Sequence, residues 1–225
     1  MSARPLPAKH RLTICFAHVA YRMGERFALR STGMNWFEVR SPDELKARIA
    51  EADVLLCSGL WRNEFIARAP RLAFVQSISA GTDQYSRDAL AAAGIRVASA
   101  QGANERAVAE HAIALILAMA RQIPEARDNQ AAKKWRGMIG DLSKREDELG
   151  GKTLVIVGMG RIGSRLAALA KAFDLRVIGI RRDPSRGAGA ADRVAGPECL
   201  LDVLPEADFV ALTCPLTAQT ENLID

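Results

Sequence analysis

Residues 152–163, KTLVIVGMGRIG, constrain the fold of this chain more than any other segment. They contain Thr153–Val157, a short run of apolar and β-branched residues that is typical of a buried parallel strand. Gly158, Gly160 and Gly163 follow with the spacing G-x-G-x-x-G. Apolar residues then recur at the spacing of one helix face: Ile162, Leu166, Leu169 and Phe173. The segment therefore predicts a strand, a tight turn and an amphipathic helix.

Each glycine has a physical task in such a turn. Gly158 permits the tight turn, Gly160 lets the backbone approach a pyrophosphate, and Gly163 lets helix and strand pack closely. The pyrophosphate would rest on the free N–H groups at the positive start of the helix. We therefore predict a dinucleotide-binding turn made by Gly158, Gly160, Arg161, Ile162 and Gly163. A glycine-rich turn without a ligand is the other interpretation, and the flanking strand and helix make it the weaker one.

The composition is that of an ordinary globular protein. Of the 225 residues, 49% are hydrophobic and 25% are charged, which supports a large core in one or two domains. The net charge of +5 is modest and scattered, so we expect no nucleic-acid partner, and a basic total suits polyanionic cofactors and small carboxylates. The longest apolar stretch, 112–120, is about half as long as a membrane span, so we expect no membrane segment.

The four cysteines lie far apart and form no C-x-x-C pair. Cys15, Cys57 and Cys214 lie in or beside apolar runs, which is typical of reduced, mostly buried thiols. The basic N-terminal segment leads into a short strand-like run without a small-residue cleavage site. We therefore expect a cytoplasmic protein.

The first hundred residues alternate between strand and helix patterns. We expect strands near 12–17, 36–39, 54–57, 72–78 and 95–98, and helices from residue 42, over 63–69 and over 86–93. Ser41 followed by Pro42, with Glu44 three residues after the serine, predicts a capped helix start. This alternation predicts a small parallel α/β unit over residues 1–102.

The longest expected helix covers about residues 104–122. Asn104 is placed to cap it, and Glu105 suits its positive end. Between residues 108 and 119 the helix is apolar almost all round, so we expect it to be buried or shared with a partner chain. A polar helix to about residue 134 and an irregular charged stretch over 135–149 follow.

The second unit, which we assign to residues 103–225, contains the glycine turn. After the helix that follows the glycine turn, we expect strands over 176–180, around Val194 and over 209–213, and a helix over 198–204. Together with Thr153–Val157 these make four strands, whereas a complete dinucleotide-binding fold normally has six. A sheet that ends there has an apolar edge, from which we expect poor solubility or association with a partner.

Four segments resemble the D-isomer-specific 2-hydroxyacid dehydrogenase family in sequence and in order. SAGTDQ (79–84) resembles the family's substrate loop, and GANERAVAEHAIALILAMAR (102–121) resembles its interdomain helix. ELGGKTLVIVGMGRIG (148–163) resembles its cofactor turn, and CPLTAQTENLID (214–225) resembles the loop after its fourth cofactor strand. The resemblance covers nearly the whole chain.

The resemblance implies an α/β enzyme with a flavodoxin-like substrate domain and a Rossmann-type dinucleotide-binding domain. It implies hydride transfer between a nicotinamide cofactor and a small 2-oxo acid, such as glyoxylate or hydroxypyruvate, to give a D-2-hydroxy acid. The backbone N–H groups of Ser79, Ala80 and Gly81 would hold the substrate carboxylate, because small residues suit an anion-binding nest. Without the family, the same loop is a simple strand-to-helix turn. A homodimer formed through the interdomain helix is a further expectation.

The residues that follow the second cofactor strand decide between NAD and NADP. An acid at that position binds the ribose hydroxyls of NAD, whereas Arg181 and Arg182 stand there in this chain and suit a 2′-phosphate. We therefore predict NADP. NAD is the alternative if the carboxylate of Asp183 reaches the ribose, and a third interpretation is that both arginines are solvated charges.

Two further groups of residues are candidates for ligand binding. Cys214, Pro215 and Thr220 match the family's loop near the adenine and the nicotinamide ribose, although Pro215 is equally explained as a strand terminator. Trp61 and Arg62 follow a strand at the carboxyl edge of the sheet, where they could select the substrate side chain.

The family's catalytic residues are not assigned in this chain. Family members use an arginine to polarise the carbonyl, a histidine as general acid and base, and a glutamate to tune the histidine. Their positions lie past residue 225, and His10, His18 and His111 match none of them; His111 suits a packing or hinge role. Two explanations stay open: a truncated dehydrogenase, or a short homologue that binds nucleotide without turnover, as a scaffold or sensor.

Overall fold

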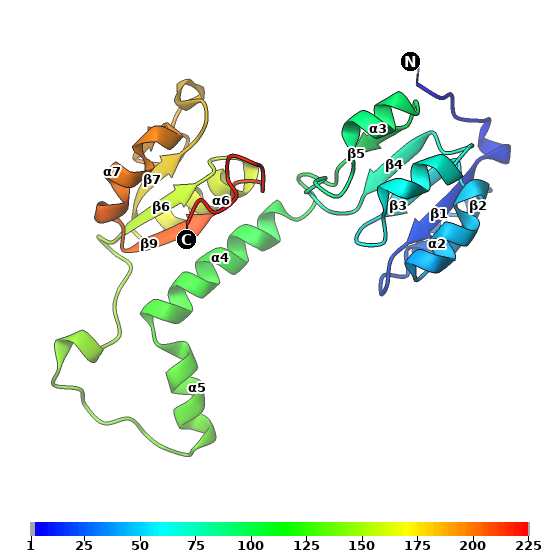
Figure 1. Ribbon diagram of the computed structural model, residues 1–225. Coiled ribbons are helices and arrows are strands. Elements are labelled where there is room, and N and C mark those ends of the chain that lie inside the picture. The colour runs from blue at the N-terminus through cyan, green and yellow to red at the C-terminus, as the bar shows by residue number, and fades with distance from the viewer. Residues whose placement is uncertain (1–2, 225) are drawn as a thin grey trace. The chain divides into compact units, whose positions relative to one another are not determined.

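The computed structural model describes residues 3–224. The chain divides into two compact units, each with its own parallel sheet (Figure 1). The N-terminal unit comprises the residues up to Ala103 together with Leu216–Ala218. The C-terminal unit comprises Asn104–Pro215 together with the residues from Gln219 onward.

The sheet of the N-terminal unit contains β1 (Thr13–Ala17), β2 (Asn35–Val39), β3 (Val54–Cys57), β4 (Phe74–Ser77) and β5 (Arg96–Ala98). All neighbouring strands are parallel, and their order is β2-β1-β3-β4-β5. This is the flavodoxin-like order, which places the carboxyl ends of β1, β3 and β4 side by side at one edge. The predicted fold class is confirmed for this unit.

Short helices connect these strands. They are α1 (Met23–Ala28), α2 (Pro42–Arg48) and α3 (Arg87–Ala92), with 3-10 turns η1 (Lys9–Arg11), η2 (Ile49–Glu51) and η3 (Asn63–Arg68). The predicted cap is confirmed: the Ser41 hydroxyl accepts a hydrogen bond from the Glu44 N–H at 3.2 Å. The sequence did not predict α1, which is only six residues long and contains Gly24. A side chain at Gly24 would collide with the ring of Trp36.

The sheet of the C-terminal unit contains β6 (Thr153–Val157), β7 (Arg176–Ile180), β8 (Arg193–Ala195) and β9 (Phe209–Leu212). These strands are parallel in the order β8-β7-β6-β9, which matches the first four strands of the dinucleotide-binding order 3-2-1-4-5-6. The predicted Rossmann-type class is confirmed. Within residues 3–224, β9 pairs only with β6, and Val210 and Leu212 are exposed on it.

The longest helix is α4 (Glu105–Ala120), and it packs along α6 (Arg161–Lys171). Ala109, Ile113, Ile116 and Ala120 are buried in this contact, while Val108, Leu115 and Met119 are exposed, so the helix is buried on one side only. The predicted cap at Asn104 is wrong, since its side chain makes no capping hydrogen bond. Val108 nevertheless donates its N–H to the Asn104 carbonyl at 3.0 Å, so the helix begins where expected.

The remaining helices of this unit are short. They are α5 (Ile123–Ala131), η4 (Leu142–Lys144), η5 (Pro184–Arg186), η6 (Pro197–Cys199), α7 (Leu200–Val203) and η7 (Leu204–Glu206). The helix expected over 198–204 is therefore split into η6, α7 and the start of η7, with Pro197 at the first position of η6 and Pro205 at the second position of η7. No single helix in the described chain is long and apolar enough to cross a membrane; α4 and α5 pass that test only as a pair bent by 66°.

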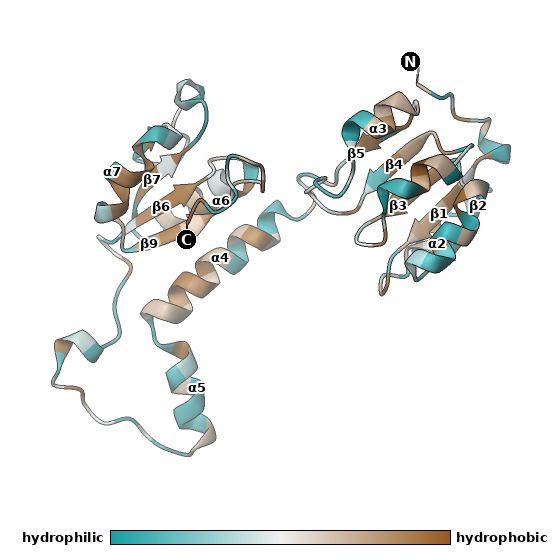
Figure 2. Ribbon diagram, in the orientation of Figure 1, coloured by the Kyte–Doolittle hydropathy of each residue, from teal (hydrophilic) through white to brown (hydrophobic). Residues whose placement is uncertain are grey.

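Hydrophobic residues concentrate in the strands of both sheets, while α5 is largely hydrophilic (Figure 2). The residues of β6 are buried throughout, and their side chains contribute to clusters on both faces of the sheet. Burial on both faces is what a central parallel strand requires. Burial fixes β6 rigidly, and the glycine turn follows directly at its carboxyl end.

Candidate functional site

The turn after β6 is built around Gly158. Its φ of +107° is a conformation that other residues rarely adopt. A Cβ at this position would lie 2.5 Å from the Cys214 nitrogen and 2.7 Å from the Cys214 Cα. The Gly158 N–H donates to the Ile180 carbonyl at 2.8 Å, so the turn is fixed between the ends of β7 and β9.

Gly160 and Gly163 have opposite surroundings. A Cβ at Gly163 would collide with the Gly158 carbonyl oxygen and would lie 2.8 Å from Thr213 Oγ1. A Cβ at Gly160 would meet no atom of residues 3–224 within 4 Å. Gly163 therefore permits close helix packing, whereas the open side of Gly160 is where a ligand can approach the backbone.

The start of α6 points unpaired donors toward this opening. Gly160 is the N-cap and provides no side-chain cap, and the first intrahelical bond runs from the Ser164 N–H to the Gly160 carbonyl at 2.9 Å. The N–H groups of Arg161, Ile162 and Gly163 precede that bond, so they are the free donors of the helix. Such donors, at the positive end of an eleven-residue helix, suit a pyrophosphate.

Arg161 lies at the first position of α6, and its guanidinium is directed toward α4. Its Nε donates to Glu105 Oε2 at 2.6 Å, and the Arg161 side chain is 63% exposed. Sequence reasoning did not pair these residues, which stand 56 positions apart. The predicted cofactor residue is thus anchored by a carboxylate from a neighbouring helix.

The end of β7 presents the two arginines. Arg181 Nη1 donates to the Gly187 carbonyl at 3.1 Å, and Arg182 is exposed. Asp183 accepts hydrogen bonds from the Ser185 N–H at 3.2 Å and the Ser185 hydroxyl at 2.5 Å. These bonds, with Arg186 and Arg181 nearby, hold the pKa of the Asp183 carboxyl below its usual range. The Asp183 carboxylate is therefore occupied within its own turn.

The loop after β9 lies against the glycine turn. Cys214 is half-buried and packs against the cluster formed by β6, β7 and α7. Thr220 Oγ1 donates to the Pro215 carbonyl at 2.6 Å, which closes this part of the loop. The backbone of Cys214 lies directly against Gly158, so this predicted residue lies at the glycine turn.

In the N-terminal unit, the loop after β4 is organised by Ser77. This fully buried serine accepts a hydrogen bond from the Ser79 N–H at 3.2 Å, and its hydroxyl lies 3.1 Å from the Ser79 carbonyl and 3.2 Å from that of Gly81. The hydroxyls of Ser79 and Ser58 are 2.5 Å apart. Ala80 and Gly81 are exposed, and their N–H groups donate to no acceptor in the part of the chain that the structure describes.

The Ser79 N–H, one of the three predicted donors, is therefore engaged by Ser77. The N–H groups of Ala80 and Gly81 are left as two adjacent donors in a braced loop, and such donors can bind a carboxylate. Sequence reasoning missed Ser77. A serine at the end of a buried strand, just before a small-residue loop, was the available signal.

Trp61 is a core residue of the N-terminal unit. It is 2% exposed, it packs against the rings of Phe65 and Tyr85, and its indole N–H donates to Asn63 at 2.9 Å. Arg62 folds back and donates to the Trp61 carbonyl at 2.7 Å. The expectation that Trp61 selects the substrate side chain is therefore wrong, because its indole is packed in the core.

The histidines occupy unrelated places. His18 Nδ1 accepts the N–H groups of Ala20 and Tyr21 at 3.0 and 2.8 Å, and it is half-buried. His10 and His111 are exposed, so His111 is not packed in the core of its unit, and a hinge role for it stays a prediction. No group of three His, Cys, Asp or Glu residues within 3–224 is arranged to hold a metal ion.

The cysteines are free thiols, and two lie in the core of the N-terminal unit. Burial raises the pKa of Cys15 to about 12 and that of Cys57 to about 11. Both therefore stay protonated at neutral pH and act as small apolar residues.

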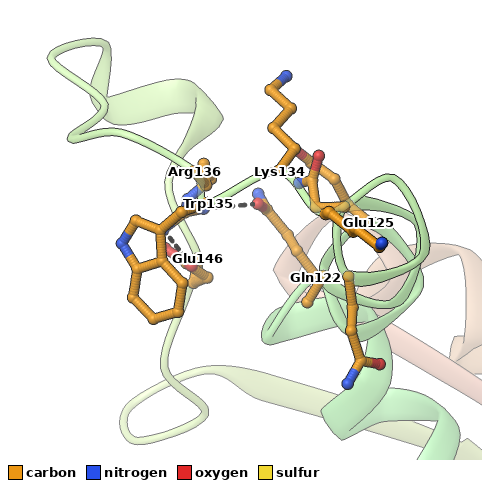
Figure 3. A pocket seen from close by; sticks show the side chains of 10 residues that line it. Gln122, Glu125, Lys134, Trp135, Arg136 and Glu146 are labelled. Carbon is orange, nitrogen blue, oxygen red and sulfur yellow. Dashed lines mark hydrogen bonds and ion pairs between the residues drawn. The ribbon is translucent and has the colours of Figure 1, made fainter.

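A cavity of about 480 Å³ lies between α5 and the segment over 133–146 (Figure 3). Arg136 spans it, with an ion pair to Glu146 and a hydrogen bond to Gln122 at 3.4 Å. None of the residues predicted to bind cofactor or substrate lines it. The cavity is thus separate from the candidate site.

Residues 113–225 match the family model described as D-isomer specific 2-hydroxyacid dehydrogenase, NAD binding domain. The chain therefore belongs to the D-isomer specific 2-hydroxyacid dehydrogenase family. This match covers the whole glycine turn and both arginines that follow β7.

Curated relatives agree with this assignment. The chain is 36% identical over 196 residues to the D-3-phosphoglycerate dehydrogenase of Mycobacterium leprae, covering 85% of this chain and 36% of that protein. It is 36% identical over 197 residues to glyoxylate/hydroxypyruvate reductase B of Yersinia enterocolitica, covering 85% of this chain and 60% of that protein. The chain thus spans about a third to three fifths of the length of these relatives.

Solved structures share the fold. The TT0316 protein of Thermus thermophilus is 29% identical, with a TM-score of 0.78 over 94% of this chain and 68% of that one. A formate dehydrogenase of Staphylococcus aureus in complex with NAD has a TM-score of 0.80 at 22% identity, covering 95% of this chain and 68% of that one. An acyclic imino acid reductase in complex with NADPH has a TM-score of 0.76 at 22% identity, covering 93% of this chain and 67% of that one. Because these neighbours bind different dinucleotides, the fold alone does not select the cofactor.

Proposed function

We propose that this chain is the dinucleotide-binding and substrate-binding part of an NADP-preferring oxidoreductase. The reaction interconverts a small 2-oxo acid, similar to glyoxylate or hydroxypyruvate, and its D-2-hydroxy acid. The observation that carries the proposal is the glycine turn, where Gly163 is packed tightly, Gly160 is open and the first N–H groups of α6 are free. The nicotinamide cofactor, when bound, supplies or accepts the hydride.

The residues present fit a dinucleotide. Gly158 and Gly160 let the backbone approach the pyrophosphate, and the N–H groups of Arg161, Ile162 and Gly163 donate to it. Cys214, Pro215 and Thr220 would border the nucleoside parts from the loop after β9.

The preference for NADP rests on the end of β7. Arg181 and Arg182 offer guanidinium groups to a 2′-phosphate, and both can bind a phosphate oxygen pair. The competing acid, Asp183, accepts two hydrogen bonds from Ser185 at its Oδ1 atom. This engagement of Oδ1 within its own turn makes Asp183 a weaker ligand for the ribose of NAD and so supports the proposed preference for NADP.

Substrate binding is proposed for the loop after β4. Ser77 and Ser58 brace Ser79, so that the free N–H groups of Ala80 and Gly81 hold the carboxylate of the 2-oxo acid. We assign no residue of this chain to proton transfer, because His10, His18 and His111 match none of the family's catalytic positions.

We also propose a cytoplasmic homodimer. Val108, Leu115 and Met119 form one exposed apolar stripe on α4, and Trp135 and Met138 are exposed beyond α5. A second copy of the chain, presenting the same stripe, would bury these side chains.

Equilibrium titration with NADPH and NADH, followed by turnover of glyoxylate, tests the proposal. Binding of NADPH with turnover supports the enzyme. Only turnover separates the enzyme from the alternative of a non-catalytic nucleotide-binding homologue, because both bind the cofactor and no proton-transfer residue is assigned in this chain. No binding of either cofactor contradicts both.

A further inference from the structure

Glu105 holds the Arg161 guanidinium through one donor only. The single bond runs from Nε to Glu105 Oε2 at 2.6 Å, and the terminal Nη groups bond to no other residue that the structure describes. Arginine has five N–H donors in a planar fork. Glu105 therefore leaves the Nη edge of the fork available to another acceptor.

The two helices that carry these residues are fixed against each other. α4 and α6 share the most extensive helix–helix contact in the C-terminal unit, and Ala109 and Ala167 are fully buried in its core. Glu105 and Arg161 are both the first residue of their helix. The carboxylate is thus presented to Arg161 by a rigid support.

The position of Glu105 is favourable electrostatically as well. A carboxylate in the first turn of α4 is stabilised by the helix dipole, whereas the cation of Arg161 at the start of α6 is not. The ion pair compensates the unfavourable position of Arg161.

We propose that Glu105 is a positioning residue for the cofactor: it orients Arg161 so that the Nη groups meet the pyrophosphate at the start of α6. This inference rests on the proposed dinucleotide site. Without Glu105, the exposed Arg161 side chain would sample many rotamers, and cofactor binding would have to order it. Glu105 acts here mainly as a hydrogen-bond acceptor for Arg161. Its negative charge does not help, because a nearby pyrophosphate repels it.

Two substitutions separate the acceptor from the charge. Glu105→Ala removes both, and we expect the Kd for NADPH to rise about three- to tenfold, the cost of immobilising one long side chain. Glu105→Gln keeps an oxygen that accepts from Nε, so we expect a Kd within about twofold of that of the unmodified chain. Glu125→Ala, which removes an exposed glutamate of α5, is the matched control.

The double variant tests the mechanism. In an Arg161→Gln background, Glu105→Ala should cause no further rise in the Kd for NADPH, because the arginine that Glu105 orients is gone. The readout is a fluorescence titration with NADPH, with a thermal melt of each variant to verify folding.

Three results overturn the inference. The first is an unchanged Kd in Glu105→Ala while the unmodified chain binds NADPH. The second is a loss that Glu105→Gln shares in full, and the third is a loss that persists in the Arg161→Gln background. Failure of the unmodified chain to bind any dinucleotide instead overturns the proposed function, and this inference with it.

Discussion

The backbone of Gly158 occupies the space that a side chain at residue 163 would need. The Gly158 carbonyl oxygen also accepts a hydrogen bond from Thr213 Oγ1 at 2.7 Å, so it has little freedom to move. This contact joins α6 to the glycine turn and to the end of β9. The glycine spacing is thus a packing requirement at one position and a ligand-approach requirement at another.

Substitutions at Gly163 and Gly160 test the packing requirement and the ligand-approach requirement separately. We expect Gly163→Ala to lower the free energy of unfolding by about 1–3 kcal/mol, because its Cβ overpacks rigid backbone. We expect Gly160→Ala to leave stability nearly unchanged while it weakens NADPH binding, because its Cβ projects into the space for the pyrophosphate. Urea unfolding and cofactor titration of both variants measure this. Equal destabilisation by the two substitutions would contradict the assignment.

The arginines after β7 are expected to govern cofactor choice. Arg181→Ala with Arg182→Ala should raise the Kd for NADPH about tenfold or more, since two charge-assisted contacts to the 2′-phosphate are lost. The Kd for NADH should change little, because NADH lacks that phosphate. Parallel titrations of the double variant provide the test, and Arg186→Ala serves as a control from the same turn. A matched loss for both cofactors would show that the arginines act on the fold instead.

Alkaline pH should destabilise the N-terminal unit. In the unfolded chain Cys15 and Cys57 ionise near pH 9.0, whereas in the folded chain burial raises their pKa values to about 12 and about 11. The stabilisation from keeping the thiols neutral is therefore fully present below pH 9.0 and is lost as the pH rises toward 11–12.

Urea unfolding at a series of pH values measures this loss. Replacement of both buried cysteines by alanine should flatten the decline above pH 9.0, the ordinary thiol pKa, while replacement of the half-buried Cys199 should not. A decline that is unaffected by the double replacement would refute the thiol origin.

A buried aspartate should stabilise the N-terminal sheet. Asp53 accepts the Thr13 N–H at 2.8 Å and bonds to Arg71 at 2.7 Å, and its side chain is only 5% exposed. In the other sheet, Asp208 accepts the Thr153 N–H at 2.8 Å, but its side chain is 40% exposed. We expect Asp53→Ala to cost about 2 kcal/mol and Asp208→Ala clearly less, because solvent screens the latter. Denaturant unfolding compares them, and the reverse order would contradict this account.

The apolar stripe on α4 should mediate self-association. Leu115 and Met119 are 52% and 68% exposed. Replacing both by lysine should shift a dimer to a monomer without unfolding it, because neither side chain belongs to the core. Sedimentation velocity reports the mass, and circular dichroism verifies the fold. A monomeric unmodified chain would rule out the proposed homodimer.

Local pattern predicted most of the strands. Val54–Cys57, Thr153–Val157 and Arg176–Ile180 lie where apolar, β-branched runs placed them, because a doubly covered parallel strand needs such a run. The order of strands was predicted only through the family resemblance. Short α1 was missed because six residues with a glycine give too little periodicity.

The candidate site was predicted only where the residues are contiguous. The glycine turn and the loop at Ser79–Gly81 are local motifs, and their spacing is visible in the sequence. The support that Ser77 gives its loop and the pairing of Glu105 with Arg161 depend on tertiary packing, which spacing alone does not reveal. Trp61 was misassigned for the same reason, since burial of its ring depends on Phe65 and Tyr85.

The central claim is that the glycine turn of this chain binds NADP. Fluorescence titration of the 225-residue chain with NADPH and, separately, with NADH tests it most directly. The account predicts saturable binding of NADPH with a Kd at least about tenfold below that of NADH, which is the worth of a charge-assisted phosphate contact. Tighter binding of NADH would contradict the role of Arg181 and Arg182, and absence of binding to either cofactor would contradict the site itself.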